Sequence, residues 1–233
     1  MKTATEDRVV DLSTGSVREL NHALHQLRHT DGAAHWHVRE PRGAHSVACG
    51  LTVPVHVEVD GPTGYYCAGM NQVATVILHG NTGTGVAENM MSGFVHVKGN
   101  ASQSAGATGQ GGLLVIDGNA GARCGISMKG IDIVVKGSVG HMSAFMAQAG
   151  NLVVCGDAGE ALGDSIYEAR IFVRGKVADL GSDCIEKEMR DEHHSLLADL
   201  LARANVDYSP GEFRRYGSAR KLYNFKTEHS GHY

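Results

Sequence analysis

Seven glycines recur along this chain at a constant spacing of 19 residues. No insertion or deletion interrupts the series, which consists of Gly61, Gly80, Gly99, Gly118, Gly137, Gly156 and Gly175. A fixed period of this length is the signature of a repeat architecture, in which each unit buries its apolar face by stacking on its neighbours. These anchor glycines therefore constrain the fold more strongly than any local propensity.

A short apolar run precedes each anchor glycine. The residues two and four positions before the anchor are aliphatic in every repeat, as Val95 and Val97 are before Gly99. The residue directly before the anchor is polar in nearly every repeat, as Lys98 and Lys136 are. Alternation with period two predicts a strand that buries one face and exposes the other.

The repeat predicts an all-β fold, a single-stranded parallel β-helix of about seven 19-residue coils over residues 51–184. Small residues recur three and seven positions after each anchor, where the chain must turn a corner and glycine permits positive φ or close backbone approach. Asn81, Asn100 and Asn119 follow successive anchors and are expected to form a ladder of hydrogen bonds along the axis. A phosphate-binding loop around Gly80 is the alternative, but no lysine or strand–helix unit supports it.

The two flanks lie outside the 19-residue spacing. Residues 1–50 are expected to form an N-terminal α/β cap, because a capping box at Ser16 and Glu19 predicts a helix over about 16–29 and residues 35–39 suit a strand. Residues 185–233 are expected to form an amphipathic helix to about residue 204 that closes the stack, followed by an aromatic and basic tail.

The tail has the composition of an interaction surface. Aromatic and arginine side chains dominate the energetic hot spots of protein interfaces. We therefore predict a docking arm for a partner protein, with packing against the chain's own coils and RNA stacking as the alternatives. The predicted interface residues are Phe213, Arg214, Arg215, Tyr216, Arg220, Tyr223 and Phe225.

Composition excludes several classes of function. A formal net charge of −4 argues against a nucleic-acid-binding face. The sequence contains no run of 18 apolar residues, so no membrane span is expected. The N-terminus has no apolar segment of the kind that a secretory signal requires. Five scattered cysteines without a C-x-x-C pair indicate reduced thiols and a cytoplasmic protein.

Candidate catalytic and metal-binding residues are few. The pairs His22/His25, His35/His37 and His193/His194 lack a cysteine or carboxylate at zinc-site spacing, so we predict structural or solvated histidines and no metal site. No motif meets the requirements of a catalytic centre, so no catalytic residue and no cofactor are expected in this chain. The methionines of residues 88–93 and 140–146 suit a core and an adaptable interface equally well.

The repeated coils resemble the GXGXG β-helix domain at the C-terminus of the glutamate synthase large subunit, a domain also present in the C subunit of formylmethanofuran dehydrogenase. The resemblance covers residues 51–184. Residues 80–93, 123–130 and 215–223 are more specifically similar to free-standing GXGXG subunits encoded beside an amidotransferase-like chain and an FMN synthase-like chain. The characterised representative of that arrangement is N-methylglutamate synthase, also called methylamine–glutamate N-methyltransferase.

The resemblance implies a right-handed β-helix without catalytic residues. Such a subunit would hold a class II amidotransferase-like partner and an FMN-binding glutamate synthase-like partner in a hetero-oligomer for nitrogen transfer to glutamate. The FMN and any iron–sulfur cluster would belong to the partner, and this chain offers no close cysteine group for a cluster. The alternative is a subunit that contributes residues to a shared active site or to an ammonia or methylamine tunnel, or one like the formylmethanofuran dehydrogenase C subunit.

Overall fold

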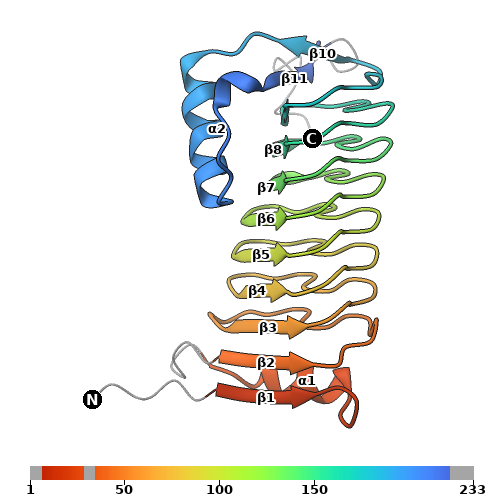
Figure 1. Ribbon diagram of the computed structural model, residues 1–233, viewed down its shortest axis with the longest axis vertical. Helices are drawn as coiled ribbons and strands as arrows, with labels where there is room; N and C mark the ends of the chain where they lie inside the picture. The colour runs from red at the N-terminus through yellow and green to blue at the C-terminus, as the bar shows by residue number, and fades with distance from the viewer. Residues whose placement is uncertain (1–6, 29–34, 221–233) are drawn as a thin grey trace, which may run out of the picture.

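The computed structural model describes residues 7–28 and 35–220. Eleven strands in this part of the chain form one sheet, in the order β1-β2-β3-β4-β5-β6-β7-β8-β9-β11-β10, and only β11 runs antiparallel to its neighbours (Figure 1). The strands that pair in parallel are β1 (Asp7–Asp11), β2 (His35–Arg39), β3 (His56–Asp60), β4 (Thr75–Leu78), β5 (Phe94–Val97), β6 (Leu113–Ile116), β7 (Lys129–Val135), β8 (Ala149–Val154) and β9 (Arg170–Val173). The edge strand β10 (Cys184–Lys187) pairs with β11 in antiparallel orientation.

The predicted repeat period is the pairing register of the sheet. Val57 pairs with Val76, and Val76 pairs with Val95 on the next strand. A second line of bridges follows the anchor glycines at the same interval, from Thr63 and Thr82 onward along the stack. The inward-facing aliphatic residues are fully buried in one continuous core. The prediction of a parallel β-helix of about seven coils is therefore confirmed.

The glycine and asparagine positions have the expected geometry. A Cβ on Gly99 would lie 2.7 Å from the carbonyl oxygen of Gly80, so the coils stack too closely for a side chain at this anchor. Gly106, seven residues after an anchor, turns the corner with a φ of 66°. The Asn81 side-chain oxygen accepts a hydrogen bond from the backbone N–H of Asn100 at 2.8 Å, and Asn100 does the same for Asn119.

The N-terminal flank adds two strands to the stack. β1 and β2 pair in parallel with each other and with β3, so the sheet begins before residue 51. The helix α1 (Val17–His25) starts at the predicted capping box and ends at His25, earlier than the sequence predicts. Leu20 and Leu24 pack into the core beneath the first coils, where α1 covers this end of the molecule (Figure 1).

The C-terminal flank differs from the prediction. Residues 184–187 form β10, and the helix α2 (Asp191–Arg203) begins later than residue 185. α2 does not close the stack but lies beside it against the outer face of β6–β9 (Figure 1). The reason is that Val115, Val134 and Phe172 give this outer face an apolar surface, which Leu197, Leu200 and Leu201 of α2 cover. The end of the stack is closed instead by β10 and β11 (Arg214–Ser218), which follows the short 3₁₀ helix η2 (Pro210–Glu212).

Candidate functional site

The first part of the predicted docking arm belongs to the chain's own cap. β11 inserts between β9 and β10 and pairs with both. Phe213 and Tyr216 are only 4% and 2% exposed, because Phe213 packs under α2 and Tyr216 in the main core. The prediction that these two residues anchor a partner is therefore wrong, since their side chains are already buried.

The arginines of the predicted interface have partners within the same cap. Arg214 donates to the carbonyl oxygen of Gly175 at 3.0 Å. Arg215 donates twice to the carbonyl oxygen of Glu188, at 3.0 and 2.8 Å. These guanidinium groups hold β11 in place and keep part of their surface toward solvent. Tyr223 and Phe225 lie outside the described residues, so their predicted role stays a prediction.

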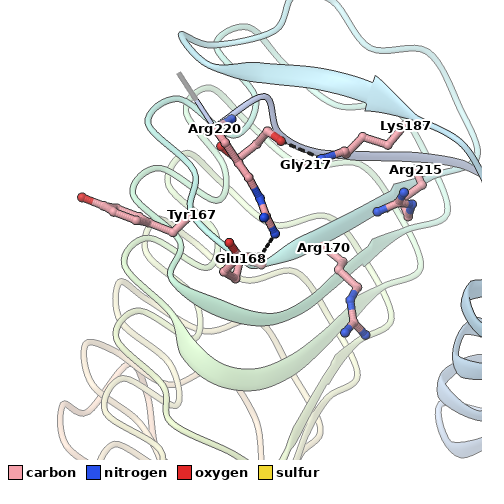
Figure 2. A pocket seen from close by; sticks show the side chains of 9 residues that line it. Tyr167, Glu168, Arg170, Lys187, Arg215, Gly217 and Arg220 are labelled. Atoms are coloured by element: carbon pink, nitrogen blue, oxygen red, sulfur yellow. Dashed lines mark hydrogen bonds and ion pairs between the residues drawn. The ribbon is translucent and has the colours of Figure 1, made fainter. Parts of the chain in front are cut away.

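A small polar hollow lies beside β11, with a volume of about 200 Å³. Figure 2 shows Arg170, Lys187, Arg215 and Arg220 around this C-terminal hollow, with Arg220 reaching toward Glu168. The Arg220 guanidinium lies 3.0 Å from the Glu168 carboxylate, and the Lys187 ammonium donates to the carbonyl oxygen of Ser218 at 2.7 Å. The hollow therefore presents more cationic than anionic groups.

Electrostatics favour an anionic group in this hollow. Partial burial, together with the charges of Arg190 and Arg170, lowers the pKa of Arg215 from its usual value. A carboxylate from outside would relieve this repulsion between like charges and accept hydrogen bonds in return. The arrangement can bind an acidic side chain or a small anion.

A second surface of interest is formed by the turns that follow the strands. Tyr65, Tyr66, Met70 and Met91 belong to the first two coils, and each exposes between 43% and 54% of its surface. A shallow depression of about 420 Å³ between Tyr66, Met70 and Glu88 lies within this Tyr–Met edge. Exposed aromatic and methionine side chains on a rigid frame are typical of binding surfaces.

The methionine-rich segments divide between core and surface. Met90 is completely buried, whereas its neighbour Met91 belongs to the exposed Tyr–Met edge. Met146, in the later methionine-rich segment, is also 39% exposed. The core interpretation is therefore confirmed for Met90, and an interface role for the exposed methionines stays a prediction.

A cluster of histidines surrounds one glutamate, an arrangement that the sequence did not predict. Glu58 on β3 lies within 3.2 Å of the Nε2 atoms of His35 and His56, and 2.8 Å from Nε2 of His79. The hydrogen bond from His79 is the main cause that lowers the pKa of Glu58 to about 2. The signal was present in the sequence, because His35 and His56 are separated by close to one coil length and so fall at equivalent places on adjacent strands.

Comparison with known proteins places the chain in a family. No protein-family profile matches it. Within residues 7–28 and 35–220, no helix has the length and apolarity needed to cross a bilayer. The chain is 62% identical over 226 residues to "Protein GlxC" of Rhizobium meliloti (strain 1021), and the match covers 97% of this chain and 99% of the relative. At this identity over almost the full length of both proteins, the chain belongs to the GlxC family, in agreement with the resemblance of its coils to glutamate-synthase-related proteins.

Proposed function

We propose that this chain is the assembly subunit of a glutamate-synthase-like complex in the cytoplasm, and specifically of N-methylglutamate synthase. It holds an amidotransferase-like subunit and an FMN-binding glutamate synthase-like subunit together, so that nitrogen passes between their sites on its way to glutamate. The FMN and any iron–sulfur cluster belong to the FMN-binding partner. The resemblance of the coils to the GXGXG domain and the similarity to GlxC support this proposal.

The observation that carries the proposal is the Tyr–Met edge on a rigid stack. Every coil is fixed to the next by backbone hydrogen bonds, and several also by the asparagine ladder, so the edge keeps its shape when a partner binds. Tyr66 and Met70 are 47% and 54% exposed, whereas the next coil has Gly85 and Asn89 at the equivalent positions. A preformed surface costs little conformational entropy on association, which suits a subunit that fixes the distance between two partners.

The C-terminal hollow provides a second contact of different chemistry. It lies near the opposite end of the stack from Tyr66 and Met70, and its arginines suit an acidic group on a partner (Figures 1 and 2). Two surfaces of unlike chemistry at separate places allow one subunit to bind two different partners at the same time. The proposal does not depend on which partner binds which surface.

Co-purification tests the assembly role. The chain is co-expressed with the amidotransferase-like and FMN synthase-like proteins, and the complex is analysed by size-exclusion chromatography. We expect the variant Tyr66→Ser/Met70→Ser to lose at least one partner, because it removes apolar contacts without touching the core. Val9→Ser is the control for loss of exposed apolar surface, since Val9 is 56% exposed on β1 and belongs to neither proposed contact. Retention of both partners by the double variant would contradict the proposed role of this edge.

Product analysis tests the specific activity. The purified complex is given either methylamine with glutamate, or glutamine with 2-oxoglutarate and a two-electron reductant, and the product is identified by mass spectrometry. N-methylglutamate formed from methylamine supports the proposal. Transfer of the glutamine amide nitrogen, followed by ¹⁵N labelling, to 2-oxoglutarate with no N-methylglutamate formed would assign the complex to ordinary glutamate synthesis and contradict the finer proposal.

A further inference from the structure

The His–Glu cluster lies on the outer face of the sheet, where β2, β3 and β4 run side by side. His35 on β2 stands directly opposite His56 on β3, and Glu58 follows two residues later on the same face of β3. His79 directly follows the end of β4. We propose that His35, His56 and Glu58 form a binding site for a divalent transition-metal ion of the zinc class.

The distances between the donor atoms fit a metal site. Glu58 Oε1 is 3.2 Å from His35 Nε2 and 3.2 Å from His56 Nε2, and donor atoms of all three residues lie within 4.8 Å of one another. Tetrahedral zinc with bonds of about 2.0–2.1 Å separates neighbouring donor atoms by about 3.3 Å. The three side chains therefore need only small adjustments to surround an ion.

The donor set is one that transition metals prefer. Two imidazole nitrogens and one carboxylate oxygen occur in zinc enzymes and in mononuclear iron sites, and they leave at least one coordination position open. The donors are 27% to 37% exposed, so an ion can reach them from solvent. Because the donors lie on the outer face of the sheet, water or a group from a partner protein could reach an open position of the ion.

Asp7 and His79 contact the proposed ligands and fix their orientation. Asp7 Oδ1 lies 3.3 Å from His35 Nδ1, and His79 Nε2 lies 2.8 Å from Glu58 Oε2. A carboxylate on the far nitrogen of a ligating histidine fixes its tautomer and makes the other nitrogen a better donor. Asp7 thus directs the lone pair of His35 Nε2 toward the site, and His79 fixes the rotation of the Glu58 carboxylate.

The site lies where the repeat is irregular. Asp7 pairs with His35 and His35 pairs with His56, and both pairs are further apart in the sequence than one regular coil. Backbone pairing holds these strands together, but the segments that connect them do not follow the 19-residue repeat. A metal bound by His35, His56 and Glu58 would join β2 to β3, and Asp7 would extend this connection to β1. Because metal binding is coupled to the folded state, it stabilises this end of the stack.

Zinc binding to the full-length chain without an affinity tag tests the proposal. The protein is treated with EDTA, dialysed, and titrated with zinc chloride in a calorimeter. We expect one zinc ion per chain and a rise in the melting temperature on binding. His56→Gln and Glu58→Gln should each weaken zinc affinity at least about 100-fold, while His79→Gln should weaken it about 10-fold through the lost orientation of Glu58.

His96→Gln is the matched control. His96 lies on the same outer face on β5 and bonds a carboxylate, Asp117, at 2.8 Å, but it has no second histidine on that carboxylate among the described contacts. The zinc affinity of the His96→Gln variant should equal that of the wild type. Circular dichroism of the metal-free proteins tests whether each variant is folded. The cysteines are present in every variant, so any binding by thiols is common to all. If the wild type binds zinc no more tightly than His35→Gln/His56→Gln, the cluster is an ion-pair network only and the proposal is wrong.

Discussion

Glycine at the anchor positions is required by the distance between coils. A Cβ on Gly99 would lie 2.5 Å from Asn81 Oδ1 and 2.7 Å from the Gly80 carbonyl oxygen, and the latter is backbone that cannot move aside. We expect Gly99→Ala to destabilise the protein by about 2 kcal/mol, because overpacking forces adjacent coils apart. Chemical denaturation measures the change.

Gly211→Ala is the control for this substitution. A Cβ at Gly211 would meet only Ser209 Oγ, at a distance of 3.7 Å. The control should therefore change the free energy of unfolding by less than about 0.5 kcal/mol. Equal effects of the two substitutions would show that the spacing of the coils does not require glycine at the anchor.

Glu58 should make stability depend on pH in the acid range. Its pKa is lowered from 4.5 to about 2, so its contribution is complete above pH 4.5 and is lost as the pH falls toward 2. In metal-free buffer, the stability advantage of the wild type over Glu58→Gln should shrink by about 1–2 kcal/mol over this range, allowing for the partial exposure of the pairs. Urea unfolding of both proteins at several pH values measures it. A difference that does not vary with pH would show that the histidines do not stabilise the carboxylate.

At the scale of elements, Phe213, directly before β11, allows a structural role of this segment to be distinguished from a docking role. Phe213 packs between α2 and the sheet. Phe213→Ala should destabilise the isolated chain by about 3 kcal/mol, because it opens a cavity there. A docking arm would instead lose partner affinity and leave the stability of the isolated chain unchanged. Thermal and chemical unfolding of the chain alone distinguish the two roles, with Tyr208→Ala as the control, since Tyr208 is 40% exposed and stacks on the Arg174 guanidinium.

The sequence predicts those elements whose contacts repeat. The strands β3–β9 follow from alternation and spacing alone, because each strand pairs with the equivalent residues of the next coil. Alternation and spacing do not predict where α2 lies, because its contacts do not repeat. Apolar Val134 and Phe172 on the expected solvent face do indicate that another element covers this part of the sheet. The insertion of β11 depends on pairing with β9 across the intervening β10, α2 and η2, and no local pattern encodes such a contact.

Only some residues of the candidate surfaces could be predicted from the sequence. Arg215 and Arg220 were chosen for their composition and do line the C-terminal hollow, but Arg170 and Lys187 come from separate strands and joined them only in the structure. The His–Glu cluster escaped a search for conventional zinc spacings because its residues are brought together by adjacent coils. In a β-helix, a spacing near one coil length is the relevant distance between ligands.

At the scale of the whole molecule, the core protects most of the thiols. Cys67, Cys124, Cys155 and Cys184 are at most 6% exposed, and burial raises the pKa of Cys67, Cys124 and Cys184 to about 12 and that of Cys155 to about 11. All five cysteines are free, as expected for Cys67 and Cys124 on coils three repeats apart. We expect a thiol reagent to modify only Cys49 in the native protein and the other four after denaturation. Rapid modification of several thiols in the native protein would mean that the coils open readily.

The uniformity of the coils has a consequence for how a partner finds its position. A shift by one coil, about 4.8 Å along the axis, places each repeated side chain over an equivalent one. The repeat by itself therefore contains no positional information, and a partner that contacted only repeated residues could bind at several equivalent steps. The departures from the repeat are β1 and β2 with the His–Glu cluster at one end, the Tyr–Met edge of the first coils, and α2 with β11 toward the other end. We therefore expect the location and direction of a bound partner to depend on these departures, and not on the residues that repeat from coil to coil.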